Sequence, residues 1–76
     1  VVIIPKAHIS GANDITPENV KYVSHIWEKI PQIAKSLGIA ENGYRVVNNC
    51  GKDGGQTVPH LHFHMMGGRS FGWPAG

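Results

Sequence analysis

The sequence predicts an α+β fold, in which one long helix packs on one face of an antiparallel sheet. The helix is predicted because apolar side chains recur every three or four residues from Val20 to Leu37. Strands are predicted at residues 1–4 and 44–48, which are rich in β-branched side chains. A further strand is predicted over residues 58–66, where histidines alternate with apolar side chains in the period of a half-buried strand.

Length and composition narrow the class of protein. The 76 residues suffice for one domain, residues 1–76, and no apolar run is long enough to span a membrane. The formal charge of +2 is small and the lysines are scattered, which argues against nucleic-acid binding. The one cysteine, Cys50, excludes an internal disulfide and fits a reducing, cytoplasmic setting. We favour a small buried thiol over a catalytic nucleophile for Cys50.

The first residues read as the end of a strand. Val1-Val2-Ile3-Ile4 is apolar, with no initiator methionine and no preceding turn. Pro5 would stop this strand, because proline has no N–H to donate to a ladder. We therefore expect the chain to be a fragment whose upstream strands lie outside it.

The predicted helix has recognisable ends. Thr16 can cap a free backbone N–H, and Pro17 suits the first helical position. Gly38 supplies the left-handed residue that often closes a helix. Pro31 lies inside the span, so we expect it to kink the helix near Trp27 or to split it in two. The predicted apolar stripe consists of Val20, Val23, Ile26, Trp27, Ile30, Ile33, Ala34 and Leu37.

The second half of the chain reads as two neighbouring strands and a tail. Asp53-Gly54 is a frequent hairpin turn pair, so the strands before and after it are expected to be antiparallel neighbours. Residues 67–76 contain several Gly and Pro residues and are expected to form a loop that exposes Phe71 and Trp73. The helix should meet the apolar face of the histidine strand, with Leu61, Phe63 and Met65 against Ile26, Ile30 and Ile33.

The opposite face of that strand carries His60, His62 and His64. In one interpretation they bind a metal ion, because neighbouring residues on one face of a strand can both reach it. Residues i and i+4 of a strand are about 13 Å apart, so His60 and His64 cannot easily share one ion with His62. The nearby acid, Asp53, is already explained as a turn residue. We therefore favour a site with no metal ion and no other cofactor.

In a second interpretation the imidazoles act on phosphate. A neutral imidazole is a nucleophile toward phosphorus, and a protonated one stabilises negative charge; histidine can serve both roles near physiological pH. The glycines of residues 51–55 would leave backbone amides free to form an anion nest, with the Thr57 hydroxyl beside them. The isolated histidines have simpler explanations, because His25 lies on the polar side of the predicted helix and His8 ends a strand. Simple decoration of a solvent-facing strand explains three histidines on one face less well.

Beyond these residues, the sequence resembles the histidine triad (HIT) superfamily. Residues 60–66, His-Leu-His-Phe-His-Met-Met, look like the family motif in which three histidines alternate with apolar residues. Further stretches similar to the family are residues 4–10, 43–49, 53–58, 67–69 and 73–76. The last two resemble the end of one branch, the histidine triad nucleotide-binding proteins, which are purine nucleoside phosphoramidases. The resemblance implies that residues 1–76 are a single, partial HIT domain that lacks the upstream strands, a fourth histidine and part of the nucleoside pocket.

The resemblance also implies a role for each residue at a matching position. His62 would be the nucleophile, attacking the α-phosphorus to form a covalent nucleotidyl-histidine that water then hydrolyses. His64 would contact the phosphate or the leaving group, and His60 would orient His62, partly through its backbone carbonyl. Trp73 would reach the neighbouring subunit's site in a homodimer. The residues implied to line or flank the phosphate are Asn49, Gly55, Gln56 and Thr57.

The function implied is hydrolysis of the P–N (or P–O) bond at the α-phosphate of a purine nucleoside phosphoramidate or adenylate. The ligand would be an AMP-type purine nucleotide, with no cofactor, no nucleic acid and no membrane involved. One alternative is a non-catalytic module that binds purine nucleotides without turnover. Another is a dinucleoside polyphosphate hydrolase of the same superfamily, against which the Trp73-Pro74 tail argues.

Overall fold

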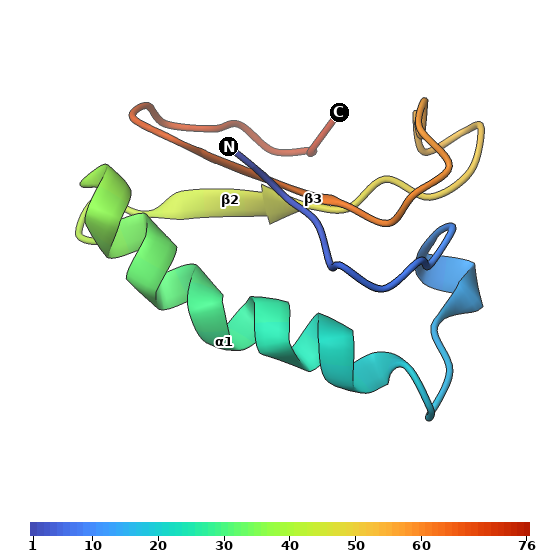
Figure 1. Ribbon diagram of the computed structural model, residues 1–76. Helices are drawn as coiled ribbons and strands as arrows, with labels where there is room; N and C mark the ends of the chain where they lie inside the picture. The colour runs from blue at the N-terminus through green and yellow to red at the C-terminus, as the bar shows by residue number, and fades with distance from the viewer.

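The computed structural model describes residues 1–76 and contains one α-helix and three strands. The strands are β1 (Val2–Ile3), β2 (Tyr44–Val47) and β3 (Phe63–Gly67), and the helix is α1 (Val20–Leu37). A 3-10 turn, η1 (Ala12–Asp14), follows β1. The sheet order is β1-β3-β2, and both outer strands run antiparallel to β3. The predicted α+β fold, an antiparallel sheet with one long helix on one side, is confirmed (Figure 1).

Helix α1 begins four residues later than the cap predicted at Thr16. The side chains of Thr16 and Asn19 are nevertheless paired: the Asn19 N–H donates to the Thr16 hydroxyl (3.2 Å), and the Thr16 N–H donates to Asn19 Oδ1 (2.7 Å). Such reciprocal bonds satisfy two backbone donors at a helix entrance, as in a capping box. Residues 17–19 form a turn, so the regular helix starts only at Val20.

The C-terminal end of α1 forms as predicted, and the proline inside the helix does not divide it. Gly38 closes the helix in the left-handed conformation (φ 76°), and the next N–H, of Ile39, donates to Ala34 O (3.0 Å), as predicted for a glycine-terminated helix. Pro31 does not split the helix, which runs through it without a break. Proline removes only the one hydrogen bond that the Trp27 carbonyl would accept. The hydrophobic contacts of the buried helix face outweigh the loss of this hydrogen bond.

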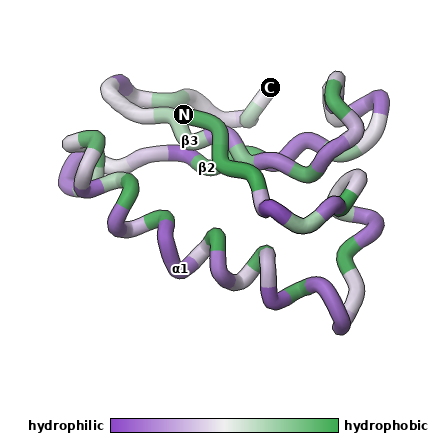
Figure 2. Tube along the Cα trace, viewed as in Figure 1, coloured by the Kyte–Doolittle hydropathy of each residue, from purple (hydrophilic) through white to green (hydrophobic).

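The hydrophobic core lies between α1 and β3. Ala34 and Leu61 are completely buried, and Ile26, Ile30, Phe63 and Met65 are no more than 5% exposed. Figure 2 shows hydrophobic positions recurring along α1 on the side toward the sheet. Each large side chain buried in this way contributes roughly 2 kcal/mol to stability. The predicted contact between the helix and the apolar face of the histidine segment is therefore confirmed, with Ile33 only partly buried.

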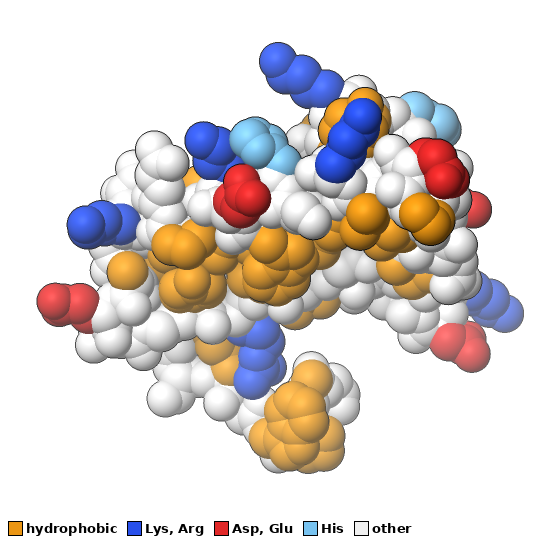
Figure 3. Space-filling view, turned by 90° about the horizontal axis from the view of Figure 1, so that it is seen from below, with side chains coloured by type: hydrophobic (Ala, Val, Ile, Leu, Met, Phe, Trp, Pro, Cys, Tyr) orange, Lys and Arg blue, Asp and Glu red, His pale blue; other side chains and the backbone are white.

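The sheet covers only part of the predicted apolar stripe of α1. Val20, Trp27 and Leu37 are 42%, 50% and 46% exposed. The cause is the narrow sheet, in which β1 is only two residues long. Hydrophobic side chains consequently form a belt on the face seen in Figure 3. The helix does not combine the length and hydrophobicity needed to cross a membrane.

The histidine strand starts at Phe63 and not at Val58. The ladder begins only where partners exist: Ile3, the last residue of β1, pairs with Phe63, and β2 ends beside His64. The alternation of faces nevertheless extends back through the preceding residues. Leu61 is buried as deeply as any residue of β3, and its N–H donates to Ile9 O (2.6 Å).

A long loop, and not a tight hairpin, joins β2 to β3. Asp53-Gly54 does form the centre of a turn, closed by the Gly55 N–H donating to Lys52 O (3.0 Å). Gly54 is packed so closely that a Cβ there would lie 2.5 Å from Cys50 O. The Cys50 side chain is half-buried, so the prediction of a buried thiol is not met.

The tail after β3 folds back along the sheet on the side away from α1 (Figure 1). Arg45 Nη2 donates to Gly72 O (2.9 Å), which fixes the tail to β2. Trp73 is 84% exposed, as predicted. Phe71, in contrast, is half-buried because the guanidinium groups of Arg45 and Arg69 lie against its ring.

Candidate active site

The three histidines line one cavity of about 490 Å³ on the side of the sheet away from α1. They face this side because the residues between them, Leu61 and Phe63, point into the core. The remaining lining comes from the N-terminal segment and from the loop after β2: Val2, Ile4, Asn49, Gly55, Thr57 and Val58. None of these side chains carries a permanent charge, so a bound anion would meet imidazoles and neutral dipoles.

His62 is held by the backbone of its own segment. Its Nδ1 lies 2.7 Å from the carbonyl oxygen of His60. Because a carbonyl oxygen can only accept, Nδ1 carries the proton of the neutral ring and Nε2 keeps its lone pair. The arrangement thus presents an unprotonated ring nitrogen as a nucleophile. This carbonyl contact is the one that the family resemblance implied.

His60 is anchored in turn to the N-terminal segment. Its Nε2 lies 3.3 Å from Pro5 O, which links the ring to the segment that follows β1. The ring of His8 packs against it edge to face, with centroids 5.4 Å apart. His8 was interpreted as a surface histidine, and no periodicity in the sequence places it beside His60. The contact is created by the loop that leads away from β1.

His64 is the only one of the three histidines inside the sheet. It is paired with Val2 of β1 and Val47 of β2, so its backbone is fixed from both sides. Its ring lies edge to face with that of His62, with centroids 5.0 Å apart. Two imidazoles at this separation can contact one phosphoryl group.

Asn48 was predicted only as the end of a strand, but its side chain contacts the histidine segment. Its Nδ2 donates to the carbonyl oxygen of His62 (2.8 Å). His62 is therefore restrained at its ring through the His60 carbonyl and at its backbone through Asn48. An asparagine directly after a strand carries no signal of this role, because the contact joins two segments.

The predicted phosphate residues divide into two groups. Asn49, Gly55 and Thr57 line the cavity with the histidines, as expected. Side chains of the first and last can donate hydrogen bonds to an anion. The predicted nest of free amides is not present at Gly51 and Gly55, because the first donates to Gln56 Oε1 and the second to Lys52 O, both at 3.0 Å.

Gln56 and Trp73 lie outside the cavity lining. The Gln56 amide is used within the loops: its Nε2 donates to Ser10 O (2.8 Å) and Val58 O (3.0 Å). Gln56 thus ties the loop after β2 to the segment after β1. Trp73 projects into solvent at 84% exposure.

The side chains do not converge as metal binding would require. No group of three His, Cys, Asp or Glu residues is arranged to hold an ion. His60 and His62 each direct one ring nitrogen at a backbone carbonyl, which leaves one nitrogen per ring for any ligand. A free ring nitrogen of this kind can contact a phosphoryl oxygen or attack phosphorus.

Comparison with known proteins identifies the family of this chain. The HIT domain model matches residues 1–71. A HIT-like protein of Synechococcus elongatus is 43% identical over 76 residues, which are 100% of this chain and 66% of that protein. The purine nucleoside phosphoramidase of Escherichia coli K12 is 39% identical over 72 residues, 95% of this chain and 60% of the enzyme. The chain thus spans less than two thirds of the length of these two relatives, 66% and 60%.

A solved structure agrees with the sequence comparison. The crystal structure of a HIT family hydrolase from Legionella pneumophila Philadelphia 1 superimposes with a TM-score of 0.93 at 40% sequence identity. The superposition covers 99% of this chain and 67% of the hydrolase. Because the family model matches residues 1–71 of the 76, the chain belongs to the HIT domain family.

Proposed function

We propose that the protein is a hydrolase that cleaves the P–N (or P–O) bond at the α-phosphate of a purine nucleoside phosphoramidate or adenylate. His62 is the nucleophile and becomes covalently attached to the nucleotide. Residues 1–76 belong to one HIT domain and supply the histidines and the phosphate contacts. An AMP-type nucleotide is the product.

The observation that carries this proposal is the 2.7 Å contact between His62 Nδ1 and His60 O. It keeps Nε2 free to attack phosphorus. When Nε2 acquires the nucleotidyl group, the ring becomes a cation that still has its proton on Nδ1. The His60 carbonyl then accepts a charge-assisted hydrogen bond, which is stronger than the bond made by the neutral ring. The same contact therefore orients the nucleophile and stabilises the intermediate.

The reaction proceeds in two displacements. In the first, the lone pair of His62 Nε2 forms a bond to the α-phosphorus, while the P–N bond breaks and its electron pair leaves with the amine, which takes up a proton. In the second, a water oxygen bonds to phosphorus, the water loses a proton, and the bond to His62 breaks. A nucleoside monophosphate is released, and Nε2 recovers its lone pair.

The other cavity residues have supporting roles in this proposal. His64, whose ring centroid lies 5.0 Å from that of His62, contacts the phosphoryl group or the leaving nitrogen. Asn49 and Thr57 donate to phosphoryl oxygens, and Gly55 leaves room for the phosphate because it has no side chain. These contacts are worth most where charge develops in the transition state.

The similarity to the purine nucleoside phosphoramidase of E. coli supports the substrate class. The assay is AMP release from adenosine 5′-phosphoramidate by the full-length protein and its His62→Asn variant. Loss of the nucleophile should reduce kcat/KM about 1,000-fold or more, which corresponds to about 4 kcal/mol. His25→Asn is the matched control, because His25 is exposed on α1 and does not line the histidine cavity; its rate should be unchanged. Equal rates for wild type and His62→Asn would contradict the assignment.

The same assay separates the alternative functions. A non-catalytic binding module would bind AMP in calorimetry but release none from the phosphoramidate. A dinucleoside polyphosphate hydrolase would turn over diadenosine polyphosphates faster than the phosphoramidate. We expect the phosphoramidate to be the better substrate.

We also propose that the protein is a cytoplasmic homodimer in which Trp73 contacts the neighbouring subunit. Trp73 is 84% exposed, and tryptophan is among the residues enriched in protein–protein interfaces. Sedimentation of the full-length protein at micromolar concentration should give a dimer, and Trp73→Ala should weaken it. A wild-type monomer under these conditions would contradict this proposal.

A further inference from the structure

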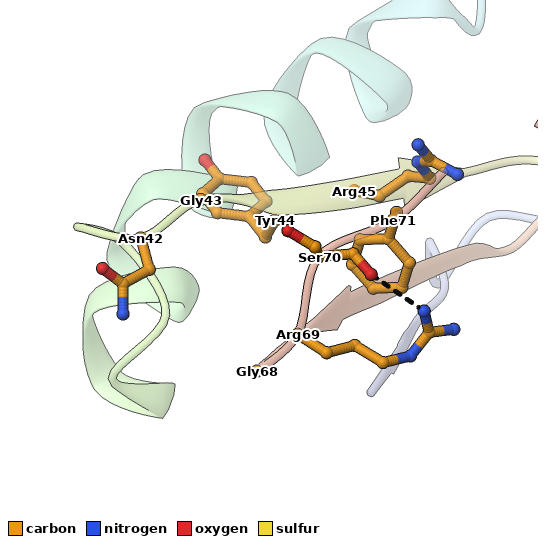
Figure 4. A pocket seen from close by; sticks show the side chains of 8 residues that line it. All are labelled: Asn42, Gly43, Tyr44, Arg45, Gly68, Arg69, Ser70 and Phe71. Carbon is orange, nitrogen blue, oxygen red and sulfur yellow. Dashed lines mark hydrogen bonds between the residues drawn. The ribbon is translucent and has the colours of Figure 1, made fainter. Parts of the chain in front are cut away.

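Two segments outside the sheet are attached to it: the tail, residues 68–76, and the loop after β1, residues 4–11. In the tail, Phe71 lies between the guanidinium groups of Arg45 and Arg69, whose central carbons are 5.0 Å and 4.4 Å from its ring centroid (Figure 4). None of these three side chains lines the histidine cavity. The loop after β1, in contrast, contacts the histidine segment directly.

The loop after β1 holds His60 and Leu61 at three points. The Leu61 N–H donates to Ile9 O at 2.6 Å. Nε2 of His60 lies 3.3 Å from Pro5 O. The third contact joins two rings, because His8 and His60 lie edge to face with their centroids 5.4 Å apart and their planes inclined at 70°. Pro5 and Ile9 are buried, whereas His8 is exposed, so His8 is the contact that can be removed without disturbing the core.

The bond between His60 and Pro5 is too long to hold the imidazole by itself. Its 3.3 Å exceeds the range of roughly 2.7–3.2 Å that is usual for N–H···O bonds. A ring held weakly at one atom can still swing about that atom. The His8 ring restricts this motion, because aromatic rings in edge-to-face contact prefer a particular separation and inclination.

Restricting the ring of His60 also restricts its carbonyl oxygen. The ring is attached on one side of the His60 Cα, and the carbonyl lies on the other side, in the same peptide unit as the Leu61 N–H. Because the ring and this N–H are both held, the torsion angle ψ of His60 between them has little freedom. That angle directs the carbonyl oxygen at Nδ1 of His62, 2.7 Å away.

We propose that His8 is a positioning residue for the reaction at His62 and acts through His60. This role rests on the proposed function, in which Nε2 of His62 attacks the α-phosphorus. His8 does not line the histidine cavity, so it is not placed to contact the phosphate itself. Misalignment of a nucleophile lowers the rate of the chemical step more than it weakens substrate binding. His8 should therefore affect kcat and leave KM nearly unchanged.

The kinetic test measures AMP release from adenosine 5′-phosphoramidate by the full-length protein. His8→Ala should lower kcat about three- to tenfold, because the edge-to-face contact is lost. His8→Phe keeps an aromatic ring but no ring nitrogen, and it should restore most of the wild-type kcat. His25→Ala removes another exposed histidine, on α1, and is the matched control with an unchanged rate. A wild-type kcat for His8→Ala, or a His8→Phe variant as slow as His8→Ala, would overturn the proposal.

NMR spectra of the resting ¹⁵N-labelled full-length protein test the same role without relying on turnover. Above the ordinary imidazole pKa of about 6.5, His62 should show a proton on Nδ1 that is shifted downfield by its hydrogen bond. In His8→Ala this signal should weaken through exchange with water, and in His8→Phe it should be retained; unchanged α1 amides verify the fold. An unaltered His62 signal in His8→Ala would overturn the positioning role. Loss of the signal in a protein that releases no AMP would instead contradict the proposed function and leave the positioning of His62 supported.

Discussion

The carbonyl oxygen of His60 lies 2.7 Å from Nδ1 of His62, and it belongs to the same peptide unit as the Leu61 N–H, which donates to Ile9 O at 2.6 Å. Leu61 itself is completely buried. The peptide plane that orients His62 is therefore held by a hydrogen bond at its other edge and by a core side chain next to it. The His62 ring is therefore positioned by the hydrophobic core through a single rigid peptide.

Leu61→Ala tests this link between core and site. Removing a completely buried leucine should destabilise the protein by about 2–5 kcal/mol, because it leaves a cavity. Below its melting temperature the variant should also lose activity, since the orienting peptide loses its anchor. Leu37→Ala is the control: Leu37 is 46% exposed, so both effects should be small. Thermal unfolding and the AMP-release assay measure the two effects, and a Leu61→Ala enzyme with full kcat would contradict the link.

Asn48→Ala removes the bond from Nδ2 to the His62 carbonyl. We expect kcat to fall about tenfold while stability changes by only about 1 kcal/mol, the net worth of one hydrogen bond. The asymmetry is expected because a small displacement of a nucleophile is costly to the reaction. Asn42→Ala, in the exposed loop before β2, should alter neither quantity. Equal kcat for the Asn48 variant and wild type would show that this bond does not position His62.

Gln56→Ala should act on stability and not on the chemistry. Three hydrogen bonds would be lost, to Ser10 O, Val58 O and the Gly51 N–H. Because they are exposed to solvent, we expect a loss of about 1–3 kcal/mol, measured by denaturant unfolding. Gln32→Ala, exposed on α1, is the control. If Gln56 contacts the substrate phosphate, as the family resemblance implied, KM would rise in the variant at a temperature where it remains folded.

Gly54→Ala should be strongly destabilising, because the added Cβ would lie 2.5 Å from Cys50 O and 2.9 Å from Cys50 N, both rigid backbone atoms. We expect a loss of about 2 kcal/mol or more, typical of severe overpacking. Gly72→Ala is the matched control, because a Cβ there meets nothing within 4 Å. Similar melting temperatures for the two variants would mean that the loop relaxes to admit the methyl group.

The parts of the fold that the sequence predicted correctly are those set by local periodicity. The alternation from His60 to Met65 assigned each side chain to its face even where the ladder is absent, because an extended backbone alternates with or without a partner strand. The glycine at the end of α1 was identified because few other residues adopt its conformation. The same alternation placed the three histidines on one face, whereas the family resemblance placed Asn49, Gly55 and Thr57 beside them; all six line one cavity.

The features that were missed depend on contacts between distant segments. The start of β3 is set by the lengths of β1 and β2, which no pattern within residues 58–62 encodes. His8 meets His60, and Arg45 meets the tail, through loop paths that composition does not determine. Pro31 does not split α1, because tertiary packing outweighs the loss of one hydrogen bond. Gln56 was placed beside the phosphate by the family resemblance, and its amide bonds to Ser10 O and Val58 O are contacts that no local pattern encodes.

The most direct test of the central claim is a single-turnover, rapid-quench experiment with adenosine 5′-phosphoramidate and excess full-length protein. The quench should be a denaturant at alkaline pH, where a phosphorus–histidine bond survives. We predict that an adenylyl group appears on the peptide that contains His62 before AMP accumulates, and then disappears as AMP forms. Formation of AMP with no adduct on His62, or with the adduct on another residue, would contradict the account.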